Sequence, residues 1–287
     1  MVPSGTRTHL GRRLRQLRTA AELHGSDLAT AIGISQGQLS KIETGKRRAS
    51  ASLVRQWAER CGATADVVDD LVELATQADT DVSQWPQRFA AGWDTDQRSY
   101  EELERKATSI CSYQVSVVPG LVQTLGYTER ILRDVVGLGE DDIAAGLRAR
   151  RARQQLLYRA GTDLRLVIAE HVLRHRWGGD AVMLEQLHHL AQLAELPTVD
   201  LAVLPVDTDM PLPHMTSFDL LTMDRDEEDV VQIETDTSEI RETEPSRVEV
   251  YRQRFDALRS HAHTGADALD AVRQIAASIA QTVFHEW

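Results

Sequence analysis

Cysteine is scarce in this 287-residue chain, which contains only Cys61 and Cys111. Two cysteines exclude a disulfide framework and a cysteine-rich zinc site. Each lies among apolar residues, so we interpret both as small buried side chains. Aromatic residues make up only 5% of the chain, but the 42% hydrophobic share suffices for globular structure. A chain of this length predicts two domains.

Long apolar runs are absent as well. No run of eighteen apolar residues exists, which excludes a membrane-spanning helix, and MVPSGTRTHLGRR at the N-terminus lacks the apolar region of a signal peptide. We therefore expect a cytoplasmic protein that binds no membrane.

Signatures of catalysis and of metal binding are missing too. The chain has no glycine-rich phosphate loop, nucleophile elbow or paired-carboxylate signature. His171 and His175 lie one helical turn apart, but no third ligand accompanies them, and the histidines at 188–189 and 261–263 lead to the same conclusion. We predict no catalytic residue, no metal site and no cofactor.

An excess of positive over negative charge is found at the N-terminal end of the chain. Residues 1–60 contain eleven Lys and Arg but four Asp and Glu, a formal charge of +7. The whole chain carries −12, so residues 61–287 carry −19. A basic head on an acidic body indicates that the head alone meets a polyanion.

Residues 26–44, SDLATAIGISQGQLSKIET, predict two short helices around a glycine turn. An inner face is formed by Leu28, Ala29, Ile32, Leu39 and Ile42. Gly33 stands at the corner, where a left-handed backbone is least strained without a Cβ. Ser35 is a natural N-cap for the second helix.

The outward face of the second helix is polar and cationic. Its side chains can hydrogen-bond to base edges and phosphates, which favours a DNA-reading unit over plain helical packing. Arg47 and Arg48 follow in the next loop, as phosphate contacts or as solvated charges. The predicted DNA-binding residues are Ser26, Ser35, Gln36, Gln38, Ser40, Lys41, Thr44, Lys46, Arg47 and Arg48.

The head resembles the Cro/cI-type (XRE) helix–turn–helix family over about residues 8–78. The matching segments are 14–18 (LRQLR), 27–29 (DLA), 33–36 (GISQ) and 39–46 (LSKIETGK). The resemblance implies a five-helix DNA-binding domain in which Gln36, Gln38 and Lys41 face the major groove. Gln36 suits adenine and Lys41 suits guanine.

The same resemblance implies further roles. Ser26 and Lys46 would hold phosphates, and Arg18 and Glu43 would form a structural pair between the first and third helices. The chain departs from the family at Gly37, where a base-reading side chain is common. That departure removes one contact and weakens the expected specificity.

Residues 79–97 predict a boundary, because they mix acids, a Trp-Pro step and glycine without sustained periodicity. Trp85, Phe89 and Trp93 lie four residues apart. We expect a packed linker, formed as a short helix against one domain.

Residues 98–287 predict an α+β effector or dimerisation domain. Strands are expected at 164–168, 199–204, 218–223 and 230–234, and an extended run at 113–119. Helices are expected at 98–113, from 120 through 132, from 141 through 156, and at 181–194, 245–262 and 265–284. The arginine-rich run at 148–159 is interpreted as an ion-paired surface. The predicted fold class is mainly α with a smaller β component, including a small, mostly antiparallel sheet.

This body also resembles a known domain over about residues 98–262. The matching segments are 118–124 (VPGLVQT), 150–154, 171–174 (HVLR), 178–179 and 196–205 (LPTVDLAVLP). They are similar to the uncharacterised C-terminal domain of many actinomycete regulators, among them the WhiJ-like regulators of streptomycetes. The resemblance implies a transcriptional regulator, often paired with a short acidic protein and sometimes described as antitoxin-like.

Three hypotheses follow for the function. The first is a sequence-specific, nucleoid-associated regulator that binds double-stranded DNA as a homodimer on a pseudo-palindromic operator, with the body binding a partner or effector. The second is an antitoxin-like protein that sequesters a small acidic partner and autoregulates its operon. The third, an enzyme with a DNA-binding head, has no positive support in the sequence.

Overall fold

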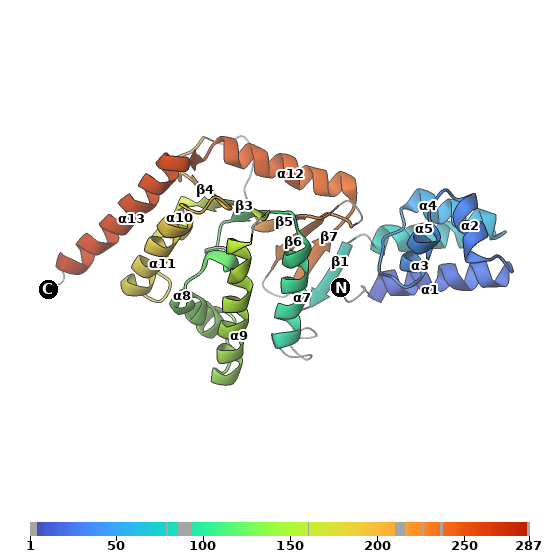
Figure 1. Cartoon of the computed structure of the whole chain (residues 1–287), viewed down its shortest axis with the longest axis horizontal. Helices are drawn as coiled ribbons and strands as arrows, with labels where there is room; N and C mark the ends of the chain where they lie inside the picture. The colour runs from blue at the N-terminus through green and yellow to red at the C-terminus, as the bar shows by residue number, and fades with distance from the viewer. Residues whose placement is uncertain are drawn as a thin grey trace. The chain divides into compact units, whose positions relative to one another are not determined.

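The computed structural model shows a mostly helical chain with one mixed β-sheet (Figure 1). It describes residues 5–78, 80–84, 93–159, 161–209, 216–224, 227–235 and 238–285. Packing divides the chain into two compact units, Met1–Val82 with Ile240–Glu244, and Ser83–Glu239 with Pro245–Trp287. We call them the head and the body.

The head is built from five helices, as the sequence predicts. Ser50 caps the fourth by accepting a hydrogen bond from the Leu53 amide at 3.2 Å. The helices are α1 (Gly5–Ala20), α2 (Gly25–Ala31), α3 (Gln36–Glu43), α4 (Ala51–Arg60) and α5 (Ala65–Ala78).

One apolar core holds these five helices together. Leu14 and Trp57 are fully buried at its centre, and Leu71 of α5 is 1% exposed. A distant segment also belongs to the head: Arg7 donates a hydrogen bond from Nε to the Ala78 carbonyl at 3.0 Å and another to Thr243 Oγ1. The side chain of Arg7 is therefore part of the internal packing of the head, since it is 9% exposed.

The sheet has eight strands among the described residues, and its pairings are mixed. The β2–β3 and β3–β4 pairs are parallel, whereas the β2–β5, β5–β6 and β4–β8 pairs are antiparallel. The strand order is β1 (Thr80–Gln84), β7 (Ser238–Glu242), β6 (Val230–Glu234), β5 (Phe218–Thr222), β2 (Ser109–Gln114), β3 (Asp163–Ala169), β4 (Val199–Leu204) and β8 (His263–Thr264).

Helical crossovers join the parallel strands, as parallel pairing requires. Those between β2 and β3 are η1 (Gly120–Val122, 3₁₀), α8 (Leu125–Arg130), η2 (Ile131–Val135, a π-helix), α9 (Glu140–Arg153) and η3 (Gln154–Tyr158, 3₁₀). Those between β3 and β4 are α10 (Glu170–Arg174) and α11 (Asp180–Leu193). The remaining helices among the described residues of the body are α7 (Trp93–Lys106), α12 (Pro245–Ser260) and α13 (Gly265–His285).

Helices cover both faces of the sheet within the body. Figure 1 shows α12 along one face, while α7, α9 and α11 lie on the other. The main core lies on this second face and includes Leu166 of β3, Leu201 of β4 and Leu221 of β5. Burial on both faces explains why these strands read as nearly continuous apolar runs.

The structure confirms the fold class and corrects several boundaries. The predicted helix at 98–113 ends at Lys106, because β2 begins at Ser109. The predicted helix from 120 through 132 is divided into η1, α8 and η2. Two central pairings are parallel, which the expected small, mostly antiparallel sheet did not include.

The predicted linker differs from a short helix at its beginning, since residues 80–84 form β1. Trp85 and Phe89 lie outside the described residues. Trp93 begins α7, but its side chain is likewise outside the description.

The arginine-rich run is only partly a surface. Arg148 and Arg151 are exposed, as expected for residues of a surface. Arg153 is buried instead, and its Nε donates to Glu104 Oε2 at 2.8 Å in a two-point ion pair. Burial of both partners makes this pair part of the packing between α7 and α9.

Candidate nucleic-acid interface

The turn between α2 and α3 has the geometry that its sequence predicts. Gly33 adopts φ +75°, in the left-handed region that glycine favours. The next amide, of Ile34, donates to the Ala29 carbonyl at 3.0 Å and closes the end of α2. Ala29 itself is 2% exposed at the crossing of the helices.

A reciprocal capping box fixes the beginning of α3. Ser35 Oγ accepts a hydrogen bond from the Gln38 amide at 3.1 Å, and Gln38 Oε1 accepts one from the Ser35 amide at 3.0 Å. The N-cap prediction for Ser35 is therefore confirmed. Because Gln38 uses its carbonyl oxygen in the cap, its NH₂ group is what remains available for another partner.

The inner and outer faces of the helix–turn–helix separate as expected. All five predicted inner residues are buried, with Leu28 at 1% and Ile32 at 7% exposure marking the range. The predicted DNA-binding residues that lie exposed are Ser26, Ser35, Gln36, Ser40, Lys41, Thr44 and Lys46. Gln38 is half-buried.

Two of the exposed hydroxyls already have local partners. Ser26 Oγ donates to Asp27 Oδ1 at 3.1 Å, and Thr44 Oγ1 donates to the Ser40 carbonyl at 2.8 Å. Both hydroxyl oxygens keep lone pairs, but a phosphate would compete with these bonds for the proton. Gln36 and Lys41 carry the longest exposed side chains of α3.

Arg47 and Arg48 differ from the other basic residues of this loop. Both are half-buried, whereas Lys46 is exposed. Arg48 Nη2 lies 3.9 Å from Glu244 Oε1, and only 14% of the Arg48 side chain is exposed. The geometry gives Arg48 a packing role inside the head.

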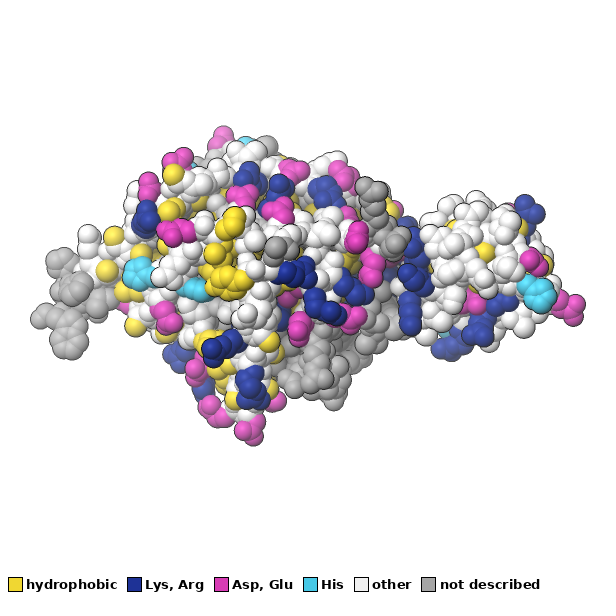
Figure 2. All heavy atoms as spheres, viewed as in Figure 1, with side chains coloured by type: hydrophobic (Ala, Val, Ile, Leu, Met, Phe, Trp, Pro, Cys, Tyr) yellow, Lys and Arg dark blue, Asp and Glu magenta, His cyan; other side chains and the backbone are white. Residues whose placement is uncertain are grey.

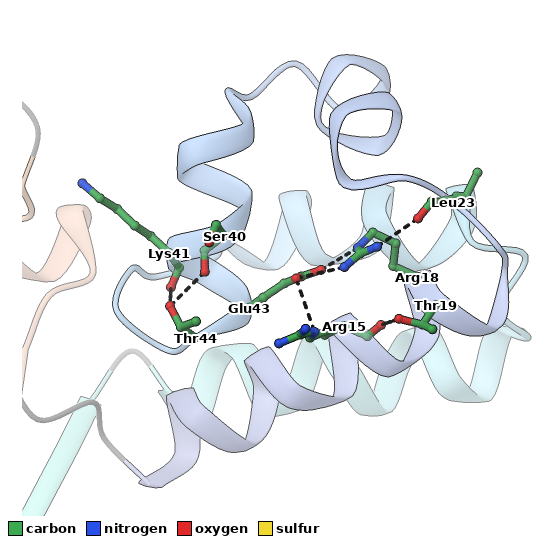
Figure 3. A network of polar contacts seen from close by, with 8 residues as sticks. All are labelled: Arg15, Arg18, Thr19, Leu23, Ser40, Lys41, Glu43 and Thr44. Carbon is green, nitrogen blue, oxygen red and sulfur yellow. Dashed lines mark hydrogen bonds and ion pairs between the residues drawn. The ribbon is translucent and has the colours of Figure 1, made fainter.

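A two-point ion pair fixes α3 against α1 (Figure 3). Arg18 donates from Nε to Glu43 Oε1 at 2.6 Å and from Nη2 to Glu43 Oε2 at 3.1 Å. The hydrogen bond that Arg18 donates to the Glu43 carboxylate raises the pKa of Arg18. Lys41 extends away from this pair in Figure 3, so its amine is directed outward. The pair that the family resemblance implies is confirmed.

Two glycines allow α1 and α3 to come this close. A Cβ on Gly11 would lie 2.4 Å from the Ile42 carbonyl oxygen, so α1 has room only for hydrogen there. Gly45 adopts φ +71°, and a Cβ on it would lie 2.9 Å from the Thr8 backbone. Sequence reasoning did not assign either role, although a glycine within an amphipathic helix is a signal of close packing.

Sequence reasoning also missed Arg15. Its Nε lies 4.0 Å from Glu43 Oε2 while 65% of its side chain is exposed, so it adds a second, weaker contact between α1 and the end of α3 (Figure 3). Its signal in the sequence was an arginine one turn before Arg18. In the view of Figure 2, the charged side chains of the head are mostly Lys and Arg, whereas both signs are interspersed over the body.

The body offers little that resembles a metal centre. His171 Nε2 contacts the Val115 carbonyl at 2.7 Å, and the His175 ring packs against Trp177. Within the described ranges, no three His, Cys, Asp or Glu side chains are grouped as a metal ion would require. No helix among these residues is long and apolar enough to cross a membrane.

Residues 118–124, one of the five segments on which the body's resemblance is based, form an irregular connection that contains η1 and leads into α8. Gln186 of α11 accepts from the Thr124 amide at 2.7 Å and donates to the Val122 carbonyl at 2.8 Å. Gln123 Nε2 donates to the Val118 carbonyl at 2.7 Å. These side chains replace the backbone partners that a regular helix would supply.

Comparison with protein families matches both units. Residues 9–71 match a family described as a helix-turn-helix domain. Residues 97–274 match the domain of unknown function DUF5753, which spans more than half of the chain. The chain belongs to the DUF5753 family. Within it, the head is a helix–turn–helix domain.

One curated relative is similar to the head. It is described as an uncharacterized transcriptional regulator in the ATPase CF(0) region of Rhodospirillum rubrum, 47% identical over 58 residues. The match covers 18% of this chain and 54% of the relative. The chain thus spans about half the length of that protein.

Two solved structures show partial likeness. The clp gene regulator ClgR from C. glutamicum is 28% identical, covering 27% of this chain and 97% of its own, with a TM-score of 0.22. The archaeal chromatin protein TrmBL2 is 13% identical, covering 75% of this chain and 69% of its own, with a TM-score of 0.33.

Proposed function

We propose that the protein is a DNA-binding transcriptional regulator of the Cro/cI type, in which α3 reads the major groove. The observation that carries the proposal is the exposed polar face of α3, fixed at its start by the capping box and at its end by the Arg18–Glu43 pair. A preorganised helix loses little conformational freedom on docking, which leaves more of the contact energy for discrimination among sequences.

Individual residues take distinct roles in this proposal. Gln36 and Lys41 read base edges, and the NH₂ of Gln38 supports them. Ser35, Ser40 and Thr44 complete the face as hydroxyl contacts. Ser26 and Lys46 bind phosphates, with Arg47 beside them. Arg48 contributes to the positive potential while its guanidinium packs near Glu244.

The active form in the proposal is a homodimer formed through the body. Two copies of α3 would then enter successive major grooves, about 34 Å apart, on a pseudo-palindromic operator. Since the net positive charge belongs to residues 1–60, which include α3, the acidic body stays clear of the duplex. Regulation follows when a ligand or partner of the body changes the dimer or its geometry.

An antitoxin-like role is the alternative proposal. There the body holds a small partner, and DNA binding serves autoregulation. The formal charge of −19 on residues 61–287 repels an acidic partner, so electrostatics favours the regulator proposal. Either role places the protein in the cytoplasm, at the nucleoid.

Selection of bound sequences from random DNA, with the full chain, tests the proposal. We expect one enriched motif with two-fold symmetry and binding that weakens steeply with salt. The double variant Gln36→Ala/Lys41→Ala serves as the control. We expect it to lose the enriched sequence motif while circular dichroism shows that it keeps its fold. No enrichment even at low salt would overturn the proposal. Light scattering of the same sample measures the dimer, and co-purification of a short protein from the native host would favour the alternative.

A further inference from the structure

Gly37 is the one position on the outer face of α3 without a side chain. It is the second residue of the helix, between Gln36 and Gln38 in sequence. Lys41 lies one turn further along, so the two residues share a stripe of the helix surface. The position without a side chain therefore lies among the residues proposed to read DNA.

The fold itself does not need a glycine at this position. The φ of Gly37 is not among the positive values found in the described residues. A Cβ built on it would meet only Ser35 Oγ, at 3.9 Å, which is an ordinary van der Waals contact. Both arms of the capping box remain compatible with a methyl group there.

Three other glycines of the head are required by the structure. Gly33 and Gly45 adopt left-handed backbone conformations, and a Cβ on Gly11 would collide with the Ile42 carbonyl oxygen. None of these reasons applies to Gly37. Helix propensity also opposes glycine, which is less favourable than alanine in a helix by up to about 1 kcal/mol.

The glycine leaves the solvent-facing surface of α3 without a side chain at this position. Without a Cβ, another surface can approach the helix backbone closely. Because the capping box fixes the first turn, that backbone presents a defined surface. The neighbouring exposed side chains, Gln36 and Lys41, flank the open strip.

We propose that Gly37 is a specificity-determining position at which the backbone of α3 packs directly against the DNA duplex. The proposal rests on the proposed DNA-reading function and adds a steric requirement to it. The missing side chain sets how deeply α3 enters the groove, and thereby the reach of Gln36 and Lys41 to the base edges.

The substitution Gly37→Ala separates this role from a structural one. We expect the variant to keep or raise the melting temperature of the full chain, because alanine fits and favours helix. We expect its affinity for the selected operator to fall by about tenfold or more, with a smaller change on random-sequence DNA. Gly37→Leu extends the series and binds the operator more weakly still.

The body provides a matched control in Gly126. Gly126 is also the second residue of its helix, α8. The side chain of the N-cap Thr124 accepts a hydrogen bond from the amide of Tyr127, three residues further along, as Ser35 does from Gln38. A Cβ on Gly126 would meet Glu185 Oε2 at 3.5 Å, again an ordinary contact. Gly126→Ala therefore adds the same methyl group in the same local geometry, and we expect unchanged operator affinity.

The outcomes distinguish a failure of the proposed DNA-binding function from a failure of the role proposed for Gly37. Wild-type chain without any operator preference contradicts the proposed function. Wild-type chain with a preferred operator, bound equally by Gly37→Ala, contradicts only the role of Gly37. A Gly37→Ala variant that loses its fold also contradicts it, since the glycine would then be structural.

Discussion

Arg18 and Glu43 join the first helix of the head to the last residue of α3 through two hydrogen bonds, of 2.6 and 3.1 Å. Their side chains are 16% and 8% exposed, so water screens the pair weakly. Arg18 also donates from Nη1 to the Leu23 carbonyl at 2.9 Å. One arginine thereby connects α1, the loop before α2, and α3.

Replacing Arg18 by alanine should destabilise the head. We expect a loss of about 2–3 kcal/mol, because the Glu43 carboxylate stays partly buried without its partner. Thermal and urea unfolding followed by circular dichroism measure the change. Arg55→Ala provides the matched control: Arg55 pairs with Asp69 at 3.1 Å, but the two side chains are 48% and 71% exposed. A similar loss in both variants would contradict the role of the Arg18–Glu43 pair.

Lys41 and Lys46 should affect DNA binding in different ways. Lys41→Ala should cost about 1–3 kcal/mol on the best operator and relax the preference at one base position. Lys46→Ala should weaken all sequences alike and reduce the dependence of binding on salt. Affinity measured by fluorescence anisotropy, on operator and scrambled duplexes at several salt concentrations, separates the two effects. Equal affinity of Lys41→Ala and wild type for the operator would remove Lys41 from the reading face.

Gly11 should tolerate no side chain at all. Gly11→Ala places a methyl group against the Ile42 carbonyl oxygen, so α1 and α3 must move apart despite the better helix propensity of alanine. We expect a loss of about 1–3 kcal/mol in unfolding free energy. In Gly25→Ala the added Cβ would meet Leu39 Cδ2 at 3.5 Å, and this control should stay near wild type. Wild-type stability of Gly11→Ala would show that the helices adjust freely.

The buried pair of Glu104 and Arg153 should matter more to stability than any surface pair of the body. Glu104→Gln removes the carboxylate that forms the two-point ion pair with the buried Arg153 guanidinium, at a cost of about 3–5 kcal/mol. Urea unfolding monitored by tryptophan fluorescence measures it. Glu140→Gln, which breaks the exposed pair with Arg133, should leave the midpoint unchanged. Comparable midpoints for both variants would place Glu104 on a solvated surface.

Asp219 should make stability depend on pH. Burial, opposed in part by the hydrogen bond from Ser112 Oγ, raises the pKa of Asp219 to about 6, from an ordinary value near 3.8. Between these values the unfolded chain releases a proton that the folded chain keeps. Stability therefore falls as pH rises through this window and stays lower above pH 6.

Asp219→Asn should remove that loss. Relative to wild type, the variant should gain about 2 kcal/mol of stability between pH 4.5 and pH 7.5, as measured by urea unfolding. Asp207→Asn, at an exposed position, controls for the removal of one negative charge. A constant difference between wild type and Asp219→Asn across this range would show that Asp219 ionises normally.

Local patterns predicted much of the head. The spacing of apolar residues around Gly33 and the short-range chemistry of Ser35 involve neighbours within a few residues, so the sequence contains the needed information. In the body, β3, β4, β5 and β6 were predicted because alternation and β-branched residues are local signals as well.

The pairing of strands that are far apart in the sequence could not be predicted in the same way. Whether β2 lies parallel to β3 or antiparallel to a different strand depends on crossovers of tens of residues, which no local pattern encodes. Strand β8 has only two residues, too few for a recognisable period, and β1 (TDVSQ) and β7 (SEIRE) each contain a single large apolar residue. Gly11 gave no more than a weak signal, since its role depends on a carbonyl thirty-one positions away.

The sequence by itself determined that a basic helix–turn–helix segment within residues 1–60 precedes an acidic α+β body, because charge, apolar period and capping chemistry are properties of neighbouring residues. Only the tertiary structure decided which polar groups of α3 remain available: Gln38 Oε1 is used in the cap, and Arg48 packs beside Glu244. The physical reason is that hydrogen bonding and burial depend on which distant side chains meet, and that follows from how the helices pack.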